Sequence, residues 1–115
     1  MQQRGDQLKD EKYVDEVLEI ETLEIQDDSP NRLVISARGR TNSDRWSRPR
    51  LVARNHVNPP ADGIQEFHFF ASPPGSVDTR NTPEIKANGA VDPVPEWLEG
   101  VRVLADKNSL ERPLD

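Results

Sequence analysis

The stretch VLEIETLEIQDDSPNRLVISARG, residues 17–39, decides the fold class of this chain. In its first half Leu18 and Ile20 alternate with glutamates, and its second half is rich in β-branched residues. Both features are typical of strands that bury one face. The alternation slips by one step near Thr22, where a bulge would return the later apolar residues to the core face. The cluster DDSPN, residues 27–31, predicts a turn between two strands.

Further segments extend this pattern along the chain. Period-two alternation predicts strands at residues 48–57, 64–71 and 100–105, and a shorter edge strand is expected near residues 84–87. Ten prolines stand mostly between these segments, and nothing in the central region predicts a helix. We therefore predict an all-β fold, a small antiparallel β-sandwich of about six or seven short strands. It would be immunoglobulin-like in architecture, with a small barrel as the alternative.

Length and composition predict one small domain with tails. The chain has 115 residues, of which 33% are hydrophobic and 31% charged. This apolar fraction is low for a chain that is folded throughout, and both ends are poor in apolar residues. We therefore predict a β-sandwich domain at residues 14–106, between flexible tails at residues 1–13 and 107–115.

The composition also excludes several classes of protein. There is no cysteine, which rules out a disulfide framework and a thiolate metal site. No stretch is long and apolar enough to cross a membrane, and the first residues lack the apolar core of a signal peptide. We therefore expect a cytoplasmic protein without membrane contact, or a secreted or periplasmic one if a leader has been removed.

Charge is strongly segregated along a chain whose net charge is −6. Residues 1–28 carry three basic and ten acidic residues, residues 29–58 carry seven and one, and residues 59–115 carry five and ten. One interpretation of this pattern is internal pairing. If the first two strands form a hairpin, glutamates of the first meet Arg38 and Arg40 of the second, and each cross-strand pair contributes about 0.2–1 kcal/mol.

The third predicted strand favours a binding surface instead, because its arginines project from one face at even spacing. They would lie beside those of the second strand if the two strands paired, and like charges placed opposite each other destabilise a sheet. Different sheets, acidic neighbours or an outside anion must therefore separate them. Guanidinium groups bind carboxylates and phosphates in two-pronged fashion, and an adjoining tryptophan would either stack on a ligand or cap one end of the sandwich. The candidate residues for binding an anion or a partner are Arg38, Arg40, Trp46, Arg48, Arg50 and Arg54.

These residues predict a non-catalytic binding or interaction module for an anionic partner. An acidic protein surface is the favoured partner, and a polyanion is the second choice. Nucleic acid is disfavoured, because the net charge is negative, aromatic residues are only 5% and no nucleic-acid motif is present. Self-association through an exposed edge strand would give a homodimer. No cofactor is expected.

The alternative prediction is a metal-binding protein or an enzyme centred on His56, Glu66 and His68. Strand alternation places Glu66 and His68 on one face, and two histidines with a carboxylate can hold a metal with open positions. Alternation often creates such pairs without a metal, so a surface histidine beside Glu66 is the structural explanation. No GxSxG elbow or glycine-rich phosphate loop is present, and we assign no catalytic residue.

Overall fold

A computed structural model describes residues 14–43, 45–74 and 82–114. Within these residues the chain forms strands and no helix, so none of them belongs to a helix that could span a membrane. The eight strands are β1 (Asp15–Glu16), β2 (Glu19–Ser29), β3 (Arg32–Arg40), β4 (Ser47–Ala53), β5 (Ile64–Ser72), β6 (Glu84–Val91), β7 (Gly100–Leu104) and β8 (Ser109–Pro113). The N-terminal tail predicted at residues 1–13 lies outside the described residues.

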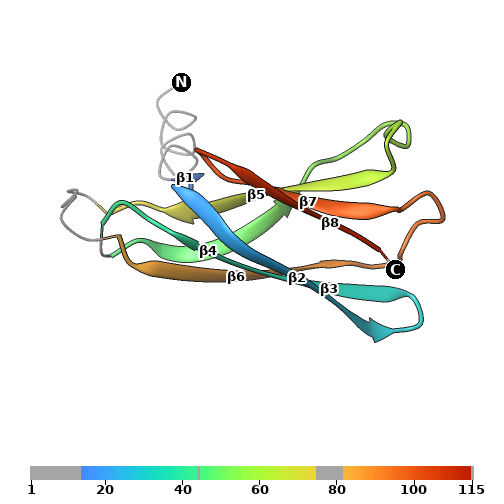
Figure 1. The fold of residues 1–115 in the computed structure, drawn as a ribbon, viewed down its shortest axis with the longest axis horizontal. Helices are drawn as coiled ribbons and strands as arrows, with labels where there is room; N and C mark the ends of the chain where they lie inside the picture. The colour runs from blue at the N-terminus through green and yellow to red at the C-terminus, as the bar shows by residue number, and fades with distance from the viewer. Residues whose placement is uncertain (1–13, 44, 75–81, 115) are drawn as a thin grey trace, which may run out of the picture.

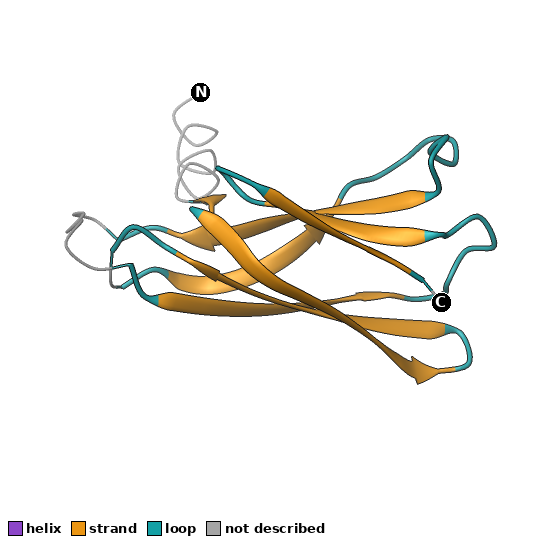
Figure 2. Ribbon diagram, viewed as in Figure 1, coloured by secondary structure: helices purple, strands orange, loops and turns teal. Residues whose placement is uncertain are grey.

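The strands form two sheets around one core, which confirms the predicted β-sandwich (Figures 1 and 2). The three-stranded sheet has the order β2-β3-β6 and is antiparallel throughout. In the five-stranded sheet β5 is central, with β4 on one edge and β7 followed by β8 on the other. The short β1 pairs with β5 beyond the end of β7. Between β5 and β7 the chain visits the other sheet as β6, so β5 and β7 run parallel.

The first hairpin has the predicted bulge. β2 and β3 pair antiparallel, and their register shifts between Ile20 and Thr22. The shift keeps both Ile20 and Leu23 buried although they are an odd number of residues apart. The turn is shorter than predicted, because β2 stays paired with β3 as far as Ser29 and two residues connect the strands.

The core is centred on β5. Phe67 and Phe69 are at most 1% exposed, and the half-buried Glu66, His68 and Phe70 alternate with them on the other face of the sheet. Gly39 of β3 lies over this centre, because an added Cβ would overlap the Glu19 carbonyl oxygen and approach the ring of Phe69 to 3.2 Å. The absence of a side chain therefore lets the β2–β3 pair lie against the aromatic core.

The C-terminal region and the ends of two strands differ from the sequence predictions. Residues 109–113, which we assigned to a tail, form β8, because they pair with β7 along its whole length and bury Leu110 against the core. The strand predicted at residues 48–57 ends at Ala53, before the loop that contains Pro59 and Pro60. The edge strand expected at residues 84–87 extends to Val91, since β3 supplies backbone partners that far.

Candidate functional site

The candidate arginines of β3 are paired within the three-stranded sheet. Arg40 Nε lies 3.2 Å from the Glu21 carboxylate, across the β2–β3 pair. Arg38 Nε donates to Thr22 Oγ1 at 3.1 Å, and its Nη1 donates to Glu84 Oε2 at 3.5 Å. These contacts agree with internal pairing for both arginines, although Arg38 takes its carboxylate from β6 and not from β2.

The candidate arginines of the third strand lie in the other sheet. β3 belongs to the three-stranded sheet and β4 to the five-stranded sheet, so the two sets of arginines do not face each other across a strand pair. Three explanations for the separation of like charges were considered, and the structure agrees with the one in which the arginines lie in different sheets. No outside anion is therefore needed to explain how the arginines coexist.

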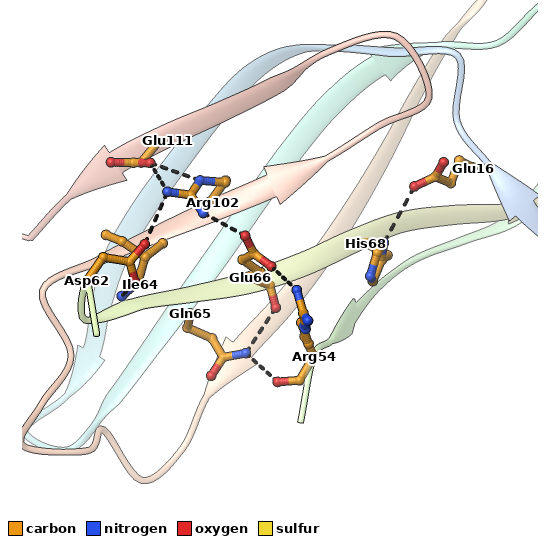
Figure 3. A network of polar contacts seen from close by, with 9 residues as sticks. All are labelled: Glu16, Arg54, Asp62, Ile64, Gln65, Glu66, His68, Arg102 and Glu111. Atoms are coloured by element: carbon orange, nitrogen blue, oxygen red, sulfur yellow. Dashed lines mark hydrogen bonds and ion pairs between the residues drawn. The ribbon is translucent and has the colours of Figure 1, made fainter. Parts of the chain in front are cut away.

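Arg54, just beyond β4, belongs to a cluster of charged groups on the five-stranded sheet (Figure 3). Its Nη1 donates to Glu66 Oε1 at 2.9 Å, and Arg102 Nη1 of β7 donates to the other oxygen of that carboxylate at 2.6 Å. Arg102 Nη2 also lies 2.7 Å from Glu111 Oε1 of β8 and 3.5 Å from Asp62 Oδ2. We call these five residues the Arg102 cluster.

The contacts of the Arg102 cluster favour the ionised forms of Glu66, Asp62 and Arg102. The pKa of Glu66 is lowered, mainly by the hydrogen bond from Arg102, with the second arginine adding to the effect against desolvation. The pKa of Asp62 is lowered chiefly by the hydrogen bond that it accepts from the backbone N–H of Ile64. The pKa of Arg102 is raised, first by its hydrogen bond to Glu111. All three shifts favour the charged forms, as is typical of a structural ion network.

Trp46 has a structural place at the end of the sandwich. Its Nε1 donates to Asn42 Oδ1 at 3.0 Å, and its partly buried ring packs against the core. These contacts agree with the structural alternative considered from the sequence, in which the tryptophan caps the sandwich. A ligand platform would need one open face of the ring and a polar tip that is not already bonded.

Arg48 and Arg50 differ from the other candidates. Arg48 is exposed, and Arg50 Nη1 donates to the Arg48 backbone oxygen at 2.7 Å. Arg45, which precedes the tryptophan and which we did not select from the sequence, is also exposed. Within residues 14–43, 45–74 and 82–114, none of these three side chains has a carboxylate partner. We call Arg45, Arg48 and Arg50 the β4 arginine surface.

The backbone of the β4 arginine surface is unusual. φ is 76° at Arg45 and 52° at Arg48, in the left-handed region that L residues rarely adopt. The pairing of β4 with β5 shifts register between Ser47 and Arg50, so that Arg48 lies in a β-bulge. A positive φ leaves no mark in a sequence when an arginine adopts it, which is why sequence reasoning passed over Arg45.

The three residues of the alternative metal centre are not brought together. The ring of His56 lies edge-on to Trp97 with 6.3 Å between centroids, and both oxygens of Glu66 accept bonds from guanidinium groups. His68 Nδ1 lies 3.5 Å from Glu16 Oε2 of β1, as Figure 3 shows. In the part of the chain that the structure describes, no group of three or more histidine, cysteine or acidic side chains could hold a metal ion.

Comparisons of the chain with protein-family models, curated proteins and solved structures found no match. The geometry is therefore the only basis for a functional argument. Its distinctive feature is a group of three arginines near the start of β4, two of them exposed, which have no carboxylate partner among the described residues. Two of the three adopt a left-handed backbone conformation.

Proposed function

We propose that this protein is a non-catalytic binding module that holds an anionic partner on the β4 arginine surface. One observation carries the proposal. Arg38, Arg40 and Arg54 each have a carboxylate within 3.5 Å, whereas the described residues offer no carboxylate to the three arginines of the β4 arginine surface. A guanidinium group presents donors in a fixed fork that matches carboxylate and phosphate oxygens, so arginines without an internal carboxylate partner suit an external anion.

Backbone strain supports the same surface. A left-handed conformation costs an L residue about 1–2 kcal/mol, and it is adopted here by Arg45 and by Arg48. Such conformations persist when the surrounding structure over-determines them, and they cluster at ligand clamps and binding sites. A β-bulge also re-aims the side chain that it carries. A glycine at either position would avoid the strain, so a role for the arginine side chains explains why they are there.

The shape of the surface favours a macromolecular partner. The hollow beside Arg45, which Trp46, Pro83 and Glu84 also line, has a volume of about 150 Å³. Pockets that enclose small molecules usually have about 300–1,000 Å³. A shallow surface with three guanidinium groups fits a broad acidic protein segment better than a small ligand. We therefore retain the acidic protein surface as the favoured partner and a polyanion as the second.

Two triple variants with equal charge change test this function. Arg45→Gln/Arg48→Gln/Arg50→Gln removes the β4 arginine surface, and Arg38→Gln/Arg40→Gln/Arg54→Gln removes paired arginines. Both are titrated with polyglutamate, heparin and single-stranded DNA at several salt concentrations. We expect the first variant to lose binding of polyglutamate and to keep its melting temperature. The second should keep binding and melt at a lower temperature.

The outcome that contradicts the proposal is equal loss of binding in both variants, because binding would then follow total charge and not the position of the arginines. Binding of DNA in preference to polyglutamate would reassign the partner class. An immunoglobulin-like description, a cytoplasmic location and a homodimer remain predictions from the sequence. Measurement of particle size over a range of concentrations tests the homodimer.

A further inference from the structure

A second surface lies along β2, at the opposite edge of the sandwich from β4. β2 pairs with β3 on one side only. The other side faces β8, and no backbone hydrogen bond joins β2 to β8 in the described part of the chain. Two side chains cover the first half of this edge. Asn108 donates to Ile20 O at 2.9 Å and accepts from Ile20 N at 2.8 Å, and Arg112 Nε donates to Leu23 O at 3.0 Å.

The second half of the β2 edge is open. In an antiparallel strand the N–H and C=O of alternate residues point to the same side. Since the Leu23 carbonyl points toward β8, the N–H and C=O groups of Ile25 and Asp27 point to that side too. Neither residue has a backbone or side-chain partner there among the described residues. This edge therefore presents the alternating donors and acceptors that an added strand requires.

A groove accompanies the open edge. Two hollows of about 450 and 550 Å³ adjoin along β2 and share Ile25 and Pro113 in their walls. The first hollow is also lined by the apolar side chains of Leu33, Val94 and Leu114. Leu33 belongs to the core, and the other two pack against it. An extended segment laid along β2 would therefore place alternate side chains against apolar walls.

Charge around the groove selects the kind of segment. Glu24, Asp27 and Glu96 line the two hollows. Arg32, which also lines the groove, is already faced by Asp28 at 3.4 Å and Asp92 at 4.0 Å. With Arg112 included, five carboxylates surround two guanidinium groups. The rim is therefore negative, and it is complementary to lysine or arginine side chains.

We propose that the open edge of β2, at Ile25 and Asp27, is a docking site for an extended segment of a partner protein that alternates apolar residues and carries lysine or arginine at its ends. The segment adds to the three-stranded sheet as a further strand beside β2. Backbone hydrogen bonds supply the pairing, the apolar residues in the walls of the hollows contact alternate side chains, and the acidic rim holds the basic ends. This site is independent of the β4 arginine surface, which has the opposite charge and lies in the other sheet.

The test uses a synthetic peptide, acetyl-Lys-Val-Thr-Val-Thr-Lys-amide, titrated into the full chain labelled with ¹⁵N. We expect the largest shifts at the amides of Ile25 and Asp27. Two further peptides carry N-methyl groups that block backbone hydrogen bonds, one along one edge of the peptide strand and the other along the opposite edge. Binding through side chains alone would not distinguish these two peptides. One version should lose binding and the other should keep it, because only one edge of an added strand faces β2. A version with glutamate in place of both lysines should bind at least tenfold more weakly.

Protein variants complete the test. Asp27→Asn/Glu96→Gln should weaken the binding of the lysine peptide at least threefold at low salt. Glu19→Gln/Asp106→Asn has the same charge change outside the groove and should leave the affinity for this peptide unchanged. Equal binding of both N-methylated peptides, or no binding of the lysine peptide, would overturn the proposal. Concentration-dependent broadening at Ile25 and Asp27 without peptide would overturn it too, by assigning the edge to a second copy of this chain.

Discussion

Replacement of Glu66 by glutamine removes the charge at the centre of the Arg102 cluster with little change in shape. The Glu66 side chain is 16% exposed, and its oxygens accept bonds of 2.6 Å from Arg102 and 2.9 Å from Arg54. Arg102 is 25% exposed and Arg54 is 60% exposed. The bond to Arg102 is therefore the less screened of the two.

The structure sets the expected magnitude. Charge-assisted hydrogen bonds contribute about 1.5–3 kcal/mol when protected, and exposed ion pairs contribute about 0–1 kcal/mol. Glutamine keeps an acceptor oxygen, and Glu111 still binds Arg102 in the variant. We therefore expect Glu66→Gln to lower the free energy of unfolding by about 1–2 kcal/mol at pH 7. For a domain of this size, each kcal/mol corresponds to about 4–8 °C in melting temperature.

The effect should depend on pH in a defined direction. The pKa of Glu66 is lower in the folded chain than its ordinary value of 4.5. The ionised carboxylate therefore stabilises the fold fully above pH 4.5, and this contribution is lost as the pH falls through the lower pKa of the folded state. Urea unfolding at pH 7 and at successively lower pH measures it. The difference in stability between wild type and Glu66→Gln should shrink as the pH falls.

Two results would refute this reasoning. A difference that is constant from pH 7 downward would mean that glutamine acts through packing and not through charge. If Glu66→Gln lowered the free energy of unfolding by less than about 0.3 kcal/mol at pH 7, solvent would screen the cluster completely. Arg102→Met is the matched partner variant, because a double-mutant cycle with Glu66→Gln isolates their interaction.

Three further predictions follow from other parts of the fold. Phe69→Ala should lower the free energy of unfolding by about 3–5 kcal/mol in chemical denaturation, because this fully buried ring is at the centre of the core. Gly39→Ala should yield little folded protein on expression, since its Cβ would overlap the Glu19 carbonyl oxygen, whereas Gly89→Ala, with its nearest contact at 3.1 Å, should fold. Arg48→Gly should keep or raise the melting temperature by releasing the left-handed strain, and should weaken binding of an acidic probe, so that stability and binding change in opposite directions.

Local patterns predicted most of the strands, and they predicted the buried face of β5 correctly. The alternation of phenylalanines with polar residues in β5, and the slip in β2 that signals a bulge, are set by backbone geometry within a few residues. Such signals do not need a partner strand to be read. Of the proposed β4 arginine surface, Arg48 and Arg50 could be selected from the sequence on the same basis, as cations on one predicted strand.

Contacts between distant residues decided what local patterns could not. Arg102 shows in the sequence only as a single charge among apolar residues, and it meets Glu66 because β5 and β7 run parallel. The same is true of β8, whose sequence has no clear period and whose order comes from pairing with β7 and burying Leu110. A pairing between strands far apart in sequence depends on the total packing of the two sheets.

The sequence by itself determined the all-β class, the buried face of β5 and the segregation of charge, because each depends on the identity and spacing of neighbouring residues. Only the tertiary structure decided which arginines have internal partners. It placed β3 and β4 in different sheets and brought Glu21, Glu84 and Glu66 to three of the arginines, which left the β4 arginine surface unpaired within the described residues. Electrostatic partners are chosen by distance in space, and a distance in space is set by long-range strand pairing rather than by sequence spacing.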